Sequence, residues 1–187
     1  MRVLHHPVEK LVRTIDYKGV ALEVVERPDV LWVGCVDYAP NNADESDIGA
    51  TLARYQRLID IPKQALINPE WSAALSINYC VDKPCGLMFA QETYSSRQDV
   101  RYEQFLQPGG LWLRIRNDET AAALLGKERA ETHEYFSDER KILRAAAEAN
   151  GYRQNPDVSV EIEYHCHAEY ATPPHAAYAY IPVCAGA

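Results

Sequence analysis

The stretch Pro28-Asp-Val-Leu-Trp-Val33 recurs eighty residues later as Pro108-Gly-Gly-Leu-Trp-Leu113. The chain of 187 residues contains three tryptophans, and two of them occupy the same place in this phrase. Self-similarity at a fixed spacing is the sequence signature of a repeated structural unit. We therefore expect a fold built from two related units, with Trp32 and Trp112 at corresponding positions.

A second pair of phrases follows in the same order. Leu75-Ser-Ile-Asn-Tyr79 corresponds to Val160-Glu-Ile-Glu-Tyr164, so a serine and an asparagine of the first copy are replaced by Glu161 and Glu163. The two copies therefore differ in charge at matched positions. This difference makes the two glutamates candidate functional residues.

Composition narrows the class of protein. The hydrophobic share of 47% and the charged share of 25% are those of an ordinary globular domain. A net charge of −8 argues against direct binding of nucleic acid, whose phosphates require a basic face, and favours cationic small molecules. The start of the chain lacks the apolar core of a secretory signal, and no apolar run is long enough to cross a membrane. We expect a cytoplasmic monomer or homodimer with free cysteines.

The domain organisation follows from hydrophobic periodicity. Residues 7–16 carry one apolar helical stripe, which predicts an N-terminal arm or helix within residues 1–20. Residues 21–187 are expected to form a single domain, with a first unit over about 21–94 and a second over about 100–184. No stretch between the units is rich enough in Gly or Ser to be a long linker.

Each unit is predicted to contain a strand, a helix and two more strands. The expected strands cover residues 21–38, 73–79, 86–93, 101–116, 158–165 and 176–183, and the expected helices cover 46–61 and parts of 118–149. The fold class is therefore α+β, with two pseudo-symmetric strand-helix-strand-strand units. We expect antiparallel sheets with helices on one face and a ligand groove on the other.

Alternation along the strands sorts residues between these two faces. Leu113 and its apolar neighbours should meet the helices, which leaves Trp112 on the other side. In the later strand we expect Ile162 to face the helices, which places Glu161 and Glu163 in the groove with the tryptophans. Aromatic rings beside carboxylates are suited to holding a flat organic cation. Alternatively, the two glutamates could pair with Arg114 and Arg116 across strands on a solvated face.

These features resemble a known family. The Pro-Gly-Gly-Leu-Trp strand, the glutamate-bearing strand after the Gly151-Tyr152 helix stop, and the closing Tyr180-Ile-Pro-Val are similar to the GyrI-like small-molecule-binding domain. That domain is also the effector-binding module of bacterial multidrug-responsive transcription activators. The resemblance covers about residues 21–183. It implies two pseudo-symmetric units around a groove for amphipathic, often cationic and aromatic, compounds.

The resemblance also implies which residues bind the ligand. In the family a glutamate on the penultimate strand meets the ligand's charge within a wall of aromatic rings. This carries over first to Glu161, or to Glu163 if the tyrosine is used for alignment, and less directly to Glu169. The expected aromatic walls are Trp32, Trp112, Tyr38 and Tyr79.

Three functions follow as hypotheses. The first is a stand-alone binding domain that sequesters or senses hydrophobic, cationic aromatic small molecules; we expect it to stand alone because the first twenty residues are too few for a helix-turn-helix. The second is a hydrolase of electrophilic compounds, with Glu161 or Glu163 as general base and Tyr38 or Tyr79 polarising the leaving group. The third is a protein-interaction role such as gyrase modulation. The cluster His165-Cys-His167 does not meet the usual zinc spacing, so no metal, cofactor or catalytic residue is assigned.

Overall fold

The structure is a computed structural model that describes residues 9–39, 48–78, 84–116, 119–124, 136–166 and 176–186. Its strands are β1 (Lys10–Tyr17), β2 (Val20–Arg27), β3 (Val30–Ala39), β4 (Trp71–Ile77), β5 (Cys85–Thr93), β6 (Glu103–Gln107), β7 (Gly110–Arg116), β8 (Tyr152–Gln154), β9 (Val160–Cys166) and β10 (Ala176–Ala185). The helices are α1 (Ile48–Arg57), α2 (Glu119–Leu124) and α3 (Phe136–Ala149). None of the helices described is long and apolar enough to cross a membrane.

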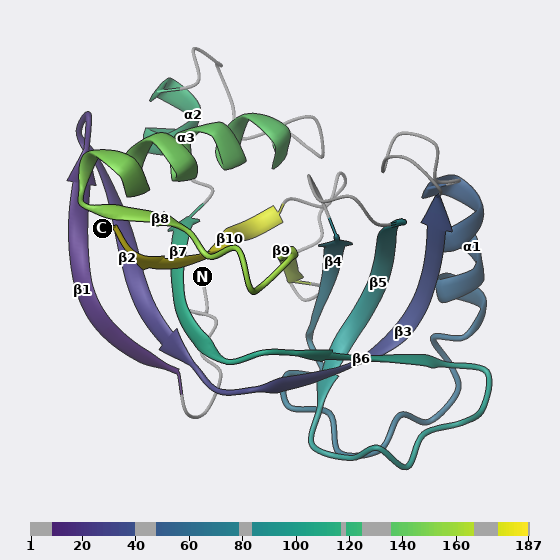
Figure 1. Cartoon of the computed structure of the whole chain (residues 1–187). Coiled ribbons are helices and arrows are strands. Elements are labelled where there is room, and N and C mark those ends of the chain that lie inside the picture. Colours follow the sequence, from purple (N-terminus) through teal and green to yellow (C-terminus); the bar gives the residue numbers. More distant parts are fainter. Residues whose placement is uncertain are drawn as a thin grey trace.

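The strands form one ten-stranded antiparallel sheet in the order β1-β2-β7-β10-β9-β4-β5-β3-β6, with β8 paired to β10 (Figure 1). The predicted α+β class is confirmed. Strands of the first half (β4) and of the second half (β9) are direct neighbours at the centre of this sheet. The pseudo-symmetry of the two halves stays a prediction.

A bent ribbon joins the two halves of the sheet. β2 pairs with β7 and β3 pairs with β6, so the same two chain segments remain paired on both sides of a bend at Pro28 and Pro108 (Figure 1). At the bend the backbone N–H of Gly109 donates to Asp29 Oδ1 over 2.7 Å. A Cβ on Gly109 would lie 2.8 Å from the carbonyl carbon of Pro28, so this crossing requires glycine. The strand expected over residues 101–116 is therefore divided at Pro108-Gly-Gly into β6 and β7.

Two apolar clusters stabilise the sheet, one on each side. The first lies under α3 and includes Leu22, Leu113, Ile115, Leu143 and Ile181. The second lies on the opposite side of the central strands and is rich in aromatic rings, among them Trp32, Trp71, Trp112, Tyr164, Tyr178 and Tyr180. We call this second cluster the aromatic interior.

Both α1 and α3 lie on the same face of the sheet. Leu113 and Ala179 pack in the apolar cluster under α3. From Ala179 on β10, the cross-strand pairs run to Glu163 on β9, then to Ala74 on β4 and finally to Phe89 on β5. Cross-strand partners project to one side of a sheet. Phe89 stacks against Tyr55 of α1 at a ring-centroid distance of 6.4 Å. The helices therefore flank the central strands at the two ends of one face.

The predicted N-terminal helix is wrong, because residues 10–17 form strand β1. β1 and β2 are joined by Lys18 and Gly19, whose φ angles of 54° and 85° are those of a two-residue hairpin turn. The helical spacing of the apolar residues was misleading, since Leu11 and Val12 are at least half exposed on this edge strand. Elsewhere the predicted elements recur with shifted ends, and α1 is shorter than expected.

Candidate functional site

The centre of the helix-bearing face is lined by small and polar side chains. β4 contributes Ser72, Ala74 and Ser76, and their cross-strand partners on β9 are His165, Glu163 and Glu161. All six are buried or nearly so. We call this set the central strip. Larger apolar side chains lie to its sides, under α3 and against α1.

Glu163 lies in the middle of the central strip. Its cross-strand neighbours are Ala74 on β4 and Ala179 on β10, so methyl groups flank the carboxylate on both sides. The residue is 5% exposed. Its Oε1 lies 3.2 Å from Nε2 of His165, and this is its one ion-pair contact with the residues that the structure describes.

Glu161 has a different environment two residues away. Its carboxylate accepts hydrogen bonds from Arg140 Nη1 at 2.8 Å, Arg144 Nη2 at 2.6 Å and Gln154 Nε2 at 3.0 Å. The two arginines come from α3, and Glu161 is 1% exposed. These contacts satisfy the charge of Glu161 and connect α3 to β9.

The expected placement of the glutamates is therefore wrong in one respect. Glu161 and Glu163 lie on the helix-bearing face, whereas Ile162 and Tyr164 point into the aromatic interior. The alternation correctly placed the two glutamates on one side of β9 and Ile162 and Tyr164 on the other. It did not show which side faces the helices, because both sides of the strand are buried. The alternative pairing with Arg114 is also wrong, since Arg114 binds Glu23 and Glu9 at 2.6 and 2.5 Å.

The predicted aromatic walls do not line the central strip. Trp32 and Trp112 are fully buried in the aromatic interior, where Trp32 Nε1 donates to Gln107 Oε1 at 3.0 Å. Tyr38 shares the Trp32 side of β3, is 51% exposed and covers Gly86. It therefore lies on the opposite side of the sheet from Glu161 and Glu163 and cannot act with them. Tyr79 and Glu169 lie outside the described residues.

A buried charge network was not expected from the sequence. Arg27 lies in the aromatic interior and donates through Nη2 to Glu92 Oε1 at 2.6 Å and to the Tyr164 hydroxyl at 2.5 Å. The Tyr164 hydroxyl also hydrogen-bonds Glu92. Burial alone lowers the pKa of Arg27, but Tyr164 and Glu92 raise it above its ordinary value, so the guanidinium keeps its charge.

Aromatic rings complete the surroundings of Arg27. Its guanidinium carbon lies 4.9 Å from the Tyr180 ring centroid, 5.4 Å from that of Tyr164 and 5.9 Å from that of Trp112. Aromatic rings and the carboxylate of Glu92 therefore surround a side chain of the protein itself, and apart from Trp112 they are not the residues expected to bind a ligand. The sequence offered little signal for it, since Arg27 follows Glu26 at the end of β2 and two charged residues at a strand end are usually exposed.

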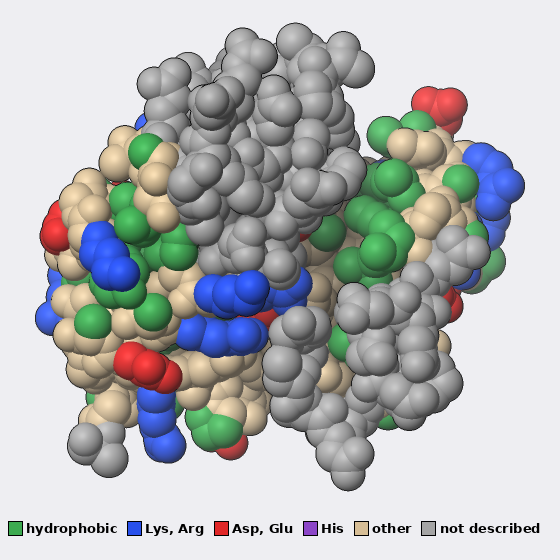
Figure 2. Space-filling model, turned by 90° about the horizontal axis from the view of Figure 1, so that it is seen from above, with side chains coloured by type: hydrophobic (Ala, Val, Ile, Leu, Met, Phe, Trp, Pro, Cys, Tyr) green, Lys and Arg blue, Asp and Glu red, His purple; other side chains and the backbone are tan. Residues whose placement is uncertain are grey.

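Charge is unevenly distributed over the helix-bearing face. Figure 2 views the molecule from above, and basic side chains gather near the centre of the view. Hydrophobic side chains lie on both sides of them, and those on the right are on the side of α1 in Figure 1. Among the described residues no group of three His, Cys, Asp or Glu side chains is arranged to hold a metal ion.

Comparisons with known proteins identify the fold. The crystal structure of the EcmrR C-terminal domain matches with a TM-score of 0.58 over 88% of this chain and 97% of that chain, at 12% identity. A putative transcription regulation protein from Staphylococcus aureus MU50 matches with a TM-score of 0.54 over 90% of this chain and 100% of that one, also at 12% identity. SAV2435 bound to tetraphenylphosphonium matches with a TM-score of 0.54 over 87% and 93%, at 13% identity.

No protein-family profile matches the chain, and no curated protein matches it. The likeness to solved structures is therefore one of fold. It confirms the fold that the resemblance implied.

Proposed function

We propose that this chain is a binding domain for hydrophobic, cationic and aromatic small molecules, and that they bind on the central strip with Glu163 as the charged contact. The observation that carries the proposal is the contrast between two glutamates on β9. Glu161 accepts bonds from two arginines and a glutamine, whereas Glu163 is buried between two alanines with one histidine beside it. Glu161 accordingly becomes a structural residue, and Glu163 becomes the key carboxylate.

A buried carboxylate with few partners favours a cationic ligand. Removing a carboxylate from water is unfavourable unless hydrogen bonds or an opposite charge replace the lost hydration. A ligand cation placed over Glu163 would supply that charge. Ala74 and Ala179 place only methyl groups beside the carboxylate, and the half-buried ring of Phe89 lies in the same cross-strand row.

The comparisons support the same ligand class. SAV2435, whose fold this chain shares, is bound to tetraphenylphosphonium in its structure. That ligand combines a delocalised positive charge with four phenyl rings. We propose that this chain takes compounds of the same kind, and that it senses or sequesters them.

Calorimetric titration with tetraphenylphosphonium tests this function. Glu163→Gln keeps the shape of the side chain and removes its charge, so we expect it to weaken binding at least about tenfold, or ~1.4 kcal/mol. Binding of neutral triphenylphosphine oxide should be the same in both proteins. The matched control is Glu148→Gln, which removes a charge from the exposed end of α3 and should bind like the wild type. Equal affinity of wild type and Glu163→Gln for the cation contradicts the proposal.

A further inference from the structure

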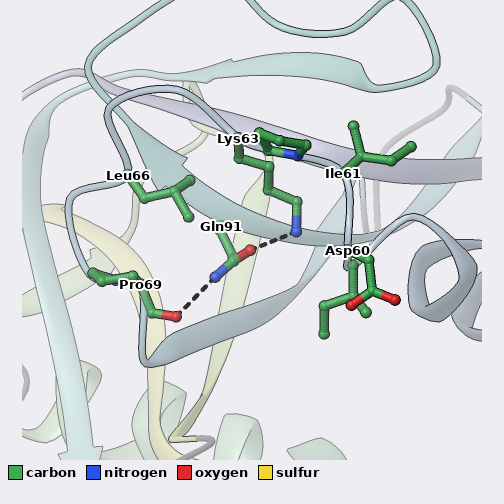
Figure 3. Close-up of a pocket in the computed structure, with 8 residues that line it drawn as sticks. Asp60, Ile61, Lys63, Leu66, Pro69 and Gln91 are labelled. Carbon is green, nitrogen blue, oxygen red and sulfur yellow. Dashed lines mark hydrogen bonds between the residues drawn. The ribbon is translucent and has the colours of Figure 1, made fainter.

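A cavity of about 350 Å³ lies beside the segment that follows α1, at a distance along the sheet from Glu163. Its walls are mainly apolar, with Ile59, Ile61, Pro62, Leu66 and Pro69, and its polar lining consists of Asp60, Lys63 and Gln91 (Figure 3). This volume lies at the small end of the range for ligand pockets, and a few placed polar groups in an apolar lining are typical of them.

Lys63 is held in this cavity by neutral groups. Its Nζ donates to Gln91 Oε1 at 2.6 Å and lies 4.8 Å and 5.5 Å from the ring centroids of Tyr55 and Tyr102. Among the residues that the structure describes, no carboxylate forms an ion pair with it. Asp60, which also lines the cavity, is exposed. Burial lowers the pKa of Lys63 because its ammonium loses water, and the nearby Cys35 thiol offsets only part of this effect.

The walls of the cavity are fixed before any ligand arrives. The Tyr102 hydroxyl donates to the carbonyls of Leu58 at 2.6 Å and Ile61 at 3.0 Å, which holds the segment after α1. Gln91 is buried, and its Nε2 donates to the Pro69 carbonyl at 3.1 Å (Figure 3). The Gln91 amide is therefore oriented with its oxygen toward Lys63. A preformed site loses little conformational entropy when a ligand binds.

We propose that this cavity is a second ligand site, for a small apolar carboxylic acid whose carboxylate binds Lys63 and whose hydrocarbon part lies against Ile61, Leu66 and Pro69. A single cation in an apolar lining matches one negative charge on a hydrophobic body better than a multiply charged phosphate. The site does not depend on the proposed function. Gln91 lies on β5 and Glu163 on β9, with β4 between them, so the two strands are roughly 10 Å apart, or two strand spacings.

Fluorescence titration with 2-naphthoate tests the site. We expect Lys63→Met to weaken binding at least about tenfold, because methionine keeps the unbranched stem against the tyrosine rings and removes the charge. The neutral 2-naphthamide should bind weakly and equally to both proteins. Lys10→Met, on the exposed edge strand β1, is the matched control and should bind naphthoate like the wild type. Equal naphthoate affinity in wild type and Lys63→Met overturns the proposal.

Two further measurements keep the test decisive. If Lys63→Met does not fold, the titration of this variant is replaced by nuclear magnetic resonance of the wild type. In that experiment saturating naphthoate must shift the side-chain amide signals of Gln91. Unshifted signals overturn the site. Glu163→Gln should bind naphthoate like the wild type, so a protein that binds naphthoate but not tetraphenylphosphonium retains this site while the proposed function fails.

Discussion

Glu161 and Glu163 lie two residues apart on the same face of β9, and Arg140 and Arg144 of α3 bind the first of them. This arrangement assigns different tasks to two chemically identical side chains. Glu161 connects a helix to the sheet, whereas Glu163 lies at the centre of the face with His165 beside it.

The first prediction concerns stability. Glu161→Gln should lower the free energy of unfolding by about 2 kcal/mol, because charge-assisted hydrogen bonds to a buried arginine are replaced by weaker neutral ones. Glu163→Gln should change it by less than about 1 kcal/mol, since its carboxylate has one histidine partner. Urea unfolding of the two variants measures both values. Equal losses would mean that α3 does not depend on Glu161.

A second prediction uses adjacent alanines on β4. Ala74→Leu places a larger side chain beside Glu163, so it should weaken tetraphenylphosphonium binding by about tenfold or more. Ala73→Leu projects to the other side, into the aromatic interior, and should destabilise the protein by about 1–3 kcal/mol through overpacking. Titration and urea unfolding of both variants separate these effects. Undiminished binding in Ala74→Leu would place the ligand elsewhere.

The third prediction tests the Arg27 network. Arg27→Met removes the cation from the cage and leaves Glu92 with less compensation, so the free energy of unfolding should fall by about 3–5 kcal/mol. The control is Arg101→Met, which breaks the exposed ion pair with Asp99 and should leave the urea midpoint unchanged. A midpoint for Arg27→Met equal to that of wild type would show that aromatic packing alone stabilises the interior.

The fourth prediction concerns alkaline pH. Burial raises the pKa of Tyr55, Tyr164 and Tyr180 above the ordinary value of 10.0. Above pH 10 the unfolded chain loses these protons while the folded chain keeps them, so stability falls as pH rises, by up to about 1.4 kcal/mol per pH unit for each tyrosine. The full contribution is present below pH 10.

Urea unfolding at pH 8, 10 and 11 measures this loss. Tyr55→Phe, which lacks one of the three hydroxyls, should lose stability less steeply between pH 10 and 11 than the wild type. An identical slope in both proteins would exclude Tyr55 as a contributor.

Much of the sheet could be predicted from sequence because its strands alternate or are bounded by Pro and Gly. The bend at Pro108-Gly-Gly is an example, since the close approach of Gly109 to Pro28 excludes any side chain there. The N-terminal segment was misjudged for a different reason. Its strand is stabilised by pairing with β2 through a Lys18-Gly19 turn, and helical spacing of four apolar residues carried no information about that partner.

The candidate site was harder to predict than the fold. Both sides of β9 are buried, so the alternation of Glu161, Ile162 and Glu163 could not identify the helix-bearing side. Arg140 and Arg144, one turn apart on α3, determine which of the two glutamates is paired with positive charge. The direction in which these arginines point follows from the packing of α3 against the sheet. The Arg27–Glu92 pair joins residues 65 apart in the chain, and no local pattern links them.

The two sides of β4 also bear on how such a domain can change over time. Ser72, Ala74 and Ser76 belong to the central strip, while the residues between them, Ala73 and Leu75, belong to the aromatic interior. Under the proposed function, substitutions at Ser72, Ala74 and Ser76 would alter which compound is recognised without disturbing the rings that keep the sheet folded. A library randomised at these three positions would therefore explore new specificities in a scaffold whose robustness is encoded by the intervening residues.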